Sequence, residues 1–332
     1  MAGTMLRVAR AALSVLSLAL VPLVIYAYSS RPDALAAMTA WPLWSWCLLG
    51  IAFAALGGRS LGHRVLAVEL ALWLLTFLLY APELRTLFRF STPNDPAWQA
   101  AREEGRGLRV VTLNCLVGTK AALAEALSHD PDVVLIQEDP KPREMIELMK
   151  RKYGDAGDVV WGNDVAIVFR GKLLEQGTIG DTHSVWARVL LSGGREVMLI
   201  TFRLRSAVFD ANLLFPSVWQ RHAANRKRRQ LEFEPIAQFL SSLPRNLPVI
   251  AGGDFNAPVG EPVFDAIPKG FVDAFEAAGV GWGNTIFNDY PIHRIDRIFV
   301  ANCRPVYAKA IRTETSDHRM VLADLIVGEP IP

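Results

Sequence analysis

The first 82 residues contain three long apolar stretches, at about 8–28, 38–57 and 65–82. A helix needs roughly 20 apolar residues to cross the hydrocarbon core of a bilayer, and each stretch comes close to this length. The rest of the 332-residue chain reads like an ordinary globular protein. A cleaved signal peptide would account for the first stretch but not for the other two. The sequence therefore predicts an integral membrane protein of the cell membrane with three transmembrane helices.

The orientation of these helices follows from the charges in the short segments between them. Arg7 and Arg10 precede the first stretch, and Arg59 and Arg64 lie between the second and the third. Arg31 alone occupies the other loop. Because Lys and Arg in short loops prefer the cytoplasm, we expect the chain after the third helix to be extracytoplasmic.

The composition excludes several classes of protein. A formal net charge of +2 is too small to indicate a nucleic-acid partner by itself. The one basic cluster, Arg221–Arg229, fits either a solvated helix face or a rim that binds phosphate. The cysteines Cys47, Cys115 and Cys303 are far apart in apolar runs, which indicates neither a zinc site nor a disulfide framework.

The chain divides into three parts by composition. Residues 1–82 form the membrane region, the polar segment 83–106 is a linker, and residues 107–328 form one globular domain. In this domain, short apolar runs outnumber predicted helices by about two to one, and 185–203 is typical of a β-hairpin. A mixed α/β (α+β) fold with substantial antiparallel pairing is expected, because a doubly wound parallel sheet needs a helix in nearly every connection.

The segment AGGDFNAP, at 251–258, is the most specific motif in the chain. It follows an apolar run, so it is expected where a buried strand breaks into a loop. Side chains two positions apart share a face of an extended chain, and Asp254 and Asn256 therefore point together. A carboxylate can orient or deprotonate a water, and an amide can donate to a phosphoryl oxygen. Taken alone, however, Asp and Asn at such a turn are often structural.

A second pair of candidates lies near the C-terminus. Asp296 sits between apolar neighbours in HRIDRIFV, where a charge needs a partner, and His318 in ETSDHRM is the natural candidate. A carboxylate on one ring nitrogen orients an imidazole and raises its pKa. Asn114 and Glu138, which end two predicted strands, form with Asp317 a set of oxygen ligands. Such a set fits Mg²⁺ or Mn²⁺ better than zinc.

In chain order, the segments LNCL, LIQE, GGDFN, RIDRIF and SDHR resemble the endonuclease/exonuclease/phosphatase superfamily, the deoxyribonuclease-like group of metal-dependent phosphoesterases. The likeness covers about residues 107–327. It implies a four-layer sandwich of two stacked mixed β-sheets flanked by helices. The implied roles place Asn114, Glu138 and Asp317 near the metal, Asp254 on the attacking water, Asn256 on the phosphate, and Asp296 against His318.

The chain departs from this family at one strand end. Members commonly carry His or Tyr in a Thr-His-Leu-like pattern, whereas this chain has Thr201, Phe202, Arg203 and Leu204. Phe202 cannot contact phosphate as a histidine would. Arg203 offers a cation and a planar donor fork, but in a regular strand it faces away from Phe202. Either the strand bulges and Arg203 binds substrate, or the contact is missing.

The leading hypothesis is a Mg²⁺- or Mn²⁺-dependent hydrolase that cleaves a phosphodiester or phosphomonoester at the membrane surface by attack of water. Its partners are the bilayer and a phosphoester, which is a lipid head group, a nucleic acid or a small molecule; no obligate protein partner is indicated. The alternative is a catalytically weakened or silent membrane-anchored binding protein on the same fold, an idea motivated by Phe202. Retention of the other site residues argues against it.

Overall fold

A computed structural model describes residues 2–58, 60–93, 95–191, 193–208 and 210–329. Arg59, which contributes to the predicted orientation of the membrane helices, lies outside the described residues. The chain forms two compact units. The membrane unit contains residues 1–84, 207–227 and 258–262, and the catalytic unit contains residues 85–206, 228–257 and 263–332.

The membrane unit is built on the helices α1 (Ala2–Ser30), α3 (Leu43–Gly57) and α4 (His63–Tyr80). Within the described residues, α1 and α4 are each long and apolar enough to cross a membrane. The helical segment 33–39 and α3 qualify only as a pair, and a bend of 78° separates them. The structure therefore supports two spanning helices, and the third predicted span requires that this bent pair count as one.

Hydrogen bonds inside the apolar bundle join its three helices. The indole nitrogen Nε1 of Trp73 donates to Ser17 Oγ at 3.0 Å, and Ser17 Oγ donates to the carbonyl oxygen of Gly50 at 3.0 Å. A Cβ atom on Gly50 would lie 1.9 Å from the ring of Trp73, so glycine permits this close approach. Small residues and interhelical hydrogen bonds are the usual means of association for helices in lipid. The three helices thus pack as one bundle.

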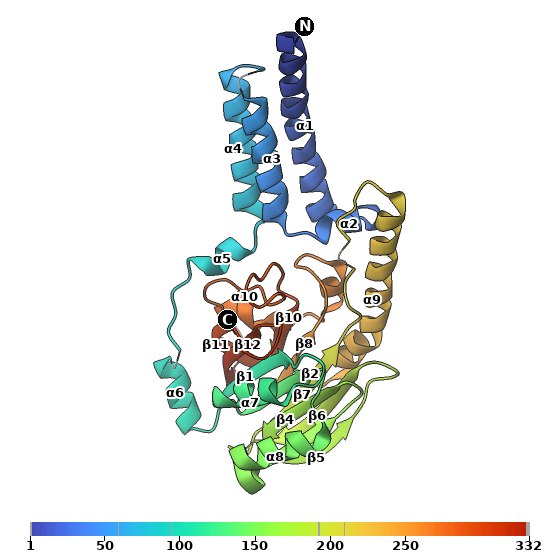
Figure 1. The fold of residues 1–332 in the computed structure, drawn as a ribbon. Helices are drawn as coiled ribbons and strands as arrows, with labels where there is room; N and C mark the ends of the chain where they lie inside the picture. The colour runs from blue at the N-terminus through green and yellow to red at the C-terminus, as the bar shows by residue number, and fades with distance from the viewer. Residues whose placement is uncertain (1, 59, 94, 192, 209, 330–332) are drawn as a thin grey trace. The chain divides into compact units, whose positions relative to one another are not determined.

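The catalytic unit contains two six-stranded sheets (Figure 1). The first has the order β11-β12-β1-β2-β4-β3, with bounds β1 Gly107–Asn114, β2 Val133–Gln137, β3 Gly157–Trp161, β4 Val165–Arg170, β11 Cys303–Ile311 and β12 Met320–Val327. The second has the order β5-β6-β7-β8-β10-β9, with bounds β5 Lys172–Gly177, β6 Ser184–Leu190, β7 Glu196–Arg203, β8 Val249–Asp254, β9 Val272–Asp273 and β10 Asp296–Ala301. The pairs β1/β2 and β7/β8 are parallel and the others antiparallel, so both sheets are mixed as predicted. The hairpin expected over 185–203 is present as β6 and β7.

Three apolar clusters define the layers of this unit. Inward side chains of both sheets, such as Leu135 and Leu199, form the central core. The helices α7 (Lys120–Ser128) and α8 (Pro142–Tyr153) cover the outer face of the first sheet. The C-terminal half of α9 (Pro216–Ser242) covers the outer face of the second. The predicted sandwich of two stacked mixed sheets flanked by helices is therefore confirmed.

The segment 83–106 is more ordered than its composition predicts. It contains α5 (Glu83–Leu87) and α6 (Pro96–Glu103). The side chain of Trp98 is only 4% exposed, packs against Ile326, and donates from Nε1 to the carbonyl oxygen of Leu108 at 3.2 Å. A single tryptophan thus docks a short amphipathic helix on the first sheet, and the role of the segment as a linker stays a prediction. The domain boundaries themselves stay a prediction.

Candidate active site

Strand register brings polar side chains to one edge of the two stacked sheets. In the second sheet, the strand register places Arg203 of β7 opposite Asp254 of β8. Asp254 in turn lies opposite Asp296 of β10. In the first sheet, Asn114 ends β1 opposite Gln137 of β2, and Glu138 follows directly. The hydrogen bond from Asn114 Nδ2 to Asp254 Oδ2, 3.3 Å long, joins the two sets. The site is therefore assembled from the ends of strands far apart in the sequence.

Asp296 and His318 form the expected pair. Asp296 Oδ2 lies 2.9 Å from His318 Nδ1, and both side chains are buried. Burial disfavours the charged imidazole, but the carboxylate of Asp296 outweighs it and raises the pKa of His318 to about 10. His318 is thus an imidazolium at neutral pH. Its Nε2, which makes no hydrogen bond within the described part of the chain, is the nitrogen left for a ligand.

Asp254 is a buried carboxylate, only 1% exposed. It accepts from the backbone nitrogen of Asn256 at 2.8 Å and from Asn256 Nδ2 at 2.9 Å. Burial, followed by the negative charge of Asp296, raises the pKa of Asp254 to about 7, against the opposing charge of His318. A carboxylate with such a pKa can take up and release a proton near neutral pH, which is what a general base requires.

Asn256 serves Asp254 in this structure. Its second amide contact runs from Nδ2 to the carbonyl oxygen of Leu204, at 2.8 Å, so both amide protons are engaged. Its backbone is in the left-handed region, with φ 49°, which asparagine tolerates better than most residues. Asn256 therefore fixes the position of Asp254, and its expected donation to a phosphoryl oxygen stays a prediction.

Glu138 is held by donors from three directions. Its Oε1 accepts from Asn114 Nδ2 at 3.1 Å and pairs with Arg203 at 2.7 Å, and its Oε2 accepts from the backbone nitrogen of Val117 at 2.6 Å. Burial acts to raise the pKa of Glu138, but these donors outweigh it and the pKa is lowered. Glu138 is therefore ionised at neutral pH. Asn114 donates to Glu138, and its amide oxygen accepts from the backbone nitrogen of Leu116 at 3.0 Å. Its place near a metal stays a prediction.

The donor chemistry fits a hard cation. Glu138 is ionised and partly exposed, and Asp317, whose carboxylate is exposed, lies close enough to His318 to raise its pKa further. Carboxylates with room for waters are what Mg²⁺ prefers. Asp254, Asp296 and His318 also present potential ligand atoms within 4.8 Å of one another. The imidazolium of His318 cannot ligate a metal, however, so this trio is better described as a hydrogen-bond network.

Arg203, and not Phe202, faces the site. The pairing of β7 with both neighbouring strands is regular, so Phe202 points outward and packs on Phe233 and Phe255, with ring centroids 5.6 and 4.8 Å away. Arg203 points inward and pairs with Asp164 at 2.6 Å as well as with Glu138. The sequence interpretation that put Phe202 at the phosphate-contacting position, with a bulge needed to bring in Arg203, was wrong because strand alternation alone selects Arg203.

Some parts of the site have no signal in the sequence. Asp164 and the backbone of Val117 were not expected there, since neither belongs to a recognisable motif. One structural sign does mark the region, because strained backbone collects at functional sites. Of the nine non-glycine residues with positive φ in the described ranges, six contribute to the site or its rim, namely Leu116, Val117, Glu138, Asp164, Asn256 and Phe287.

A two-sheet sandwich with carboxylates and a histidine at one edge defines the class of deoxyribonuclease-like phosphoesterases. The model of the endonuclease/exonuclease/phosphatase family matches residues 111–318, and the chain belongs to this family. Enzymes of the family generally depend on a divalent metal. Family membership makes the chain a phosphoesterase-type hydrolase. No curated protein matched the sequence.

Solved structures share the fold. A humanized D. rerio TDP2 carrying 14 mutations is 22% identical, with a TM-score of 0.52 over 66% of this chain and 99% of its own. An endonuclease/exonuclease/phosphatase family protein from Bacteroides thetaiotaomicron is 17% identical, with a TM-score of 0.53 over 67% and 95%. The mannosyl-6-phosphatase of Bacteroides thetaiotaomicron is 17% identical, with a TM-score of 0.50 over 66% and 99%. At these identities the likeness is evidence for the fold and not for a substrate.

Proposed function

We propose that this protein is a divalent-metal-dependent phosphoesterase that hydrolyses a phosphoester at a membrane surface by attack of water. The observation that carries the proposal is the contrast between two neighbouring buried groups. Asp254 has a pKa raised to about 7, and His318 has a pKa raised to about 10. Both pKa values are raised, so between about pH 7 and pH 10 the site holds an ionised base beside a protonated donor.

Each side chain then has a role in this reaction. Ionised Asp254 orients the water and accepts its proton, while Asn256 holds the carboxylate in place. His318 donates from Nε2 to a phosphoryl oxygen, whose negative charge grows as the bond to the leaving group breaks. Arg203 offers a second cation to the phosphate. Glu138 and Asp317 would hold Mg²⁺ or Mn²⁺, and the bound ion would offset the charge of the phosphate.

The test uses the full-length protein, purified in detergent micelles with Mg²⁺ and assayed on bis-p-nitrophenyl phosphate, a short single-stranded DNA and phospholipid vesicles. Asp254→Asn and His318→Ala are each expected to lower kcat/KM by about 10² to 10⁴, the usual contribution of a positioned acid or base. Asp155→Asn, at an exposed residue outside the site, is the matched control and should behave as the parent. A parent inactive on every substrate, or site variants equal to the control, would end the enzyme proposal.

The structure bears on two rival interpretations. The basic cluster Arg221–Arg229 favoured a nuclease, but the guanidinium groups of Arg226 and Arg229 are buried and engaged, the first with Glu261 and the second with the carbonyl oxygen of Arg205. The other arginines and the lysine of this cluster are exposed. A silent binding protein was motivated by Phe202, which packs on Phe233 and Phe255. Each interpretation loses part of its motivation, and the substrate assay decides between them.

We place the catalytic unit on the extracytoplasmic side, with the N-terminus cytoplasmic on the basis of Arg7 and Arg10. This side requires that the bent pair Asp33–Thr39 and Leu43–Gly57 count as a third span, because two spans alone would return the chain to the cytoplasm. A reporter fused to the C-terminus, active only outside the cytoplasm, should give a signal in intact cells. A cytoplasmic signal would reverse this assignment.

A further inference from the structure

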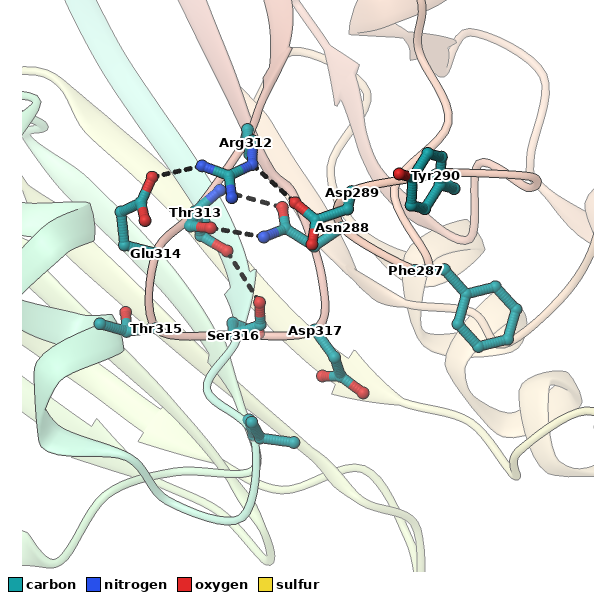
Figure 2. Close-up of a pocket in the computed structure, with 11 residues that line it drawn as sticks. Phe287, Asn288, Asp289, Tyr290, Arg312, Thr313, Glu314, Thr315, Ser316 and Asp317 are labelled. Carbon is teal, nitrogen blue, oxygen red and sulfur yellow. Dashed lines mark hydrogen bonds and ion pairs between the residues drawn. The ribbon is translucent and has the colours of Figure 1, made fainter.

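A pocket of about 580 Å³ opens beside the site. Its walls are the loop 287–290, the loop 312–317 and the side chain of Leu116. Asp317, which we assign to the metal, is shared by the pocket and the site. Figure 2 shows the carboxylate of Asp317 and the ring of Phe287 extending to the same side of the two loops. A phosphate held by His318, beside an ion on Asp317, would lie next to this pocket, which could then receive one of its substituents.

The pocket is held in shape by Asn288. Its side-chain oxygen Oδ1 accepts from the backbone nitrogen of Thr313 at 3.0 Å, and its Nδ2 donates to the carbonyl oxygen of Thr313. Its backbone nitrogen donates to the carbonyl oxygen of Asp317 at 2.8 Å, and its carbonyl oxygen accepts from Arg319 Nε at 2.8 Å. These bonds tie the loop 287–290 to the residues on either side of His318. The wall is thus preorganised next to the reacting centre.

The charges of the wall exclude a polyanion. Arg312 is its single positive residue, and it is occupied on both sides by ion pairs, with Asp289 at 2.7 Å and with Glu314. Apart from Asp317, which we assign to the metal, the wall holds this one cation and the carboxylates of Asp289 and Glu314, a formal charge of −1. A second phosphate, as in a nucleic acid or a nucleoside polyphosphate, would be repelled here. A cationic group would be attracted.

The apolar part of the wall suits the same kind of group. The rings of Phe287 and Tyr290 are 49% and 85% exposed, and Leu116 is 38% exposed. The backbone of Phe287 is strained, with φ 61°, a conformation that is unfavourable for a bulky residue. Such strain collects at functional sites. Aromatic faces combined with carboxylates are how proteins recognise ammonium groups.

We propose that this pocket binds the ammonium-bearing alcohol of the substrate, and that the enzyme acts on phosphodiesters of the choline or ethanolamine type. The inference rests on the proposed function and names its substrate class. Hydrolysis breaks the bond between phosphorus and the other ester oxygen and forms one to the oxygen of water. One water proton goes to the leaving alcohol, and a phosphomonoester of the amino alcohol is released. A lipid head group and a soluble diester share this chemistry.

The test compares three diesters with the same p-nitrophenyl leaving group and with choline, methyl or thymidine as the other substituent. The parent should prefer the choline ester in kcat/KM. Phe287→Leu and Tyr290→Leu should each lower the ratio of choline to methyl by about two- to fivefold, the usual size of an exposed cation–π contact. Phe90→Leu, at an aromatic residue 94% exposed elsewhere in the catalytic unit, is the matched control.

The charge is tested separately. Glu314→Gln should lower the ratio of choline to methyl in kcat/KM, whereas Asp155→Asn should leave this ratio as in the parent. Preference for thymidine, equal rates on choline and methyl esters, or pocket variants that match Phe90→Leu would overturn the inference while leaving the phosphoesterase intact. Inactivity on all three esters would remove the proposed function and this inference with it. Phosphatidylcholine vesicles, compared with the soluble choline ester, then distinguish a lipid from a soluble source.

Discussion

The substitution Asp296→Asn should move the entire pH profile of the enzyme to lower pH. Asp296 is the group that keeps His318 protonated against its burial, and its charge also raises the pKa of Asp254. In the parent, activity requires ionised Asp254 and protonated His318, so kcat/KM should rise near pH 7 and fall near pH 10. Asparagine has the same shape and can still accept from Nδ1, so the ring keeps its orientation while both pKa values fall.

The size of the effect follows from the protonation of His318. At pH 8, a histidine with a pKa of about 10 is almost fully protonated. A histidine at its ordinary value of about 6.5 is protonated to about 3%, which is a loss of about thirtyfold in the active form. Burial without Asp296 lowers the pKa of His318 further, whereas Asp254 and Asp317 still raise it, so a loss of about thirtyfold at pH 8 is expected where these effects balance. Part of this loss should be recovered near pH 6, where the parent is declining.

The assay measures kcat/KM from pH 5 to 11 on one soluble diester at saturating Mg²⁺, together with the thermal midpoint of each protein. Because the pKa of His318 is raised in the folded state, its contribution to stability is complete below about pH 6.5 and is lost as the pH approaches 10. The parent should therefore lose more thermal stability than Asp296→Asn over this range. A variant with a uniformly reduced profile and an unmoved alkaline limb would refute the reasoning, since Asp296 would then have only a structural role.

Two further predictions concern the metal and the core. Chelation with EDTA should abolish activity. Glu138→Gln should raise the Mg²⁺ concentration for half-maximal activity by at least about tenfold, whereas the control Asp155→Asn should not change it. An unchanged Mg²⁺ requirement in Glu138→Gln would remove Glu138 from the metal site. Phe202→Ala should destabilise the catalytic unit by roughly 3–5 kcal/mol and leave kcat per folded molecule within about twofold of the parent. A large fall in kcat with unchanged thermal stability would return Phe202 to the active site, and Phe90→Ala is the control for loss of an aromatic ring.

The strands that carry the site residues could be predicted from the sequence. The contacts between those residues could be predicted only in part. Runs such as VVTLN and DVVLIQE are short, β-branched and end in a polar residue, so Asn114 and Glu138 were placed within a residue or two of where β1 and β2 end. The edge strand β5 lacks this apolar signal, because all its residues are exposed or half-buried. The contact between Arg203 and Asp164 depends on how strands of different sheets lie against each other, which periodicity does not encode.

The same limit applies to Asn114 and Asn256. Their contacts with a metal and with phosphate stay predictions, while the hydrogen bonds that they make within the protein could not be read from the motifs. A motif identifies polar residues that gather at one place, but their roles depend on which hydrogen bonds are already made. Asn256 donates hydrogen bonds from its amide nitrogen to Leu204 and Asp254, and Asn114 donates from its amide nitrogen to Glu138 and Asp254. Each of these carboxylates would otherwise be a partly buried charge with too few donors, at a cost of several kcal/mol. The two asparagines therefore support this chemistry because their hydrogen bonds stabilise the ionised forms of Asp254 and Glu138 next to Asp296.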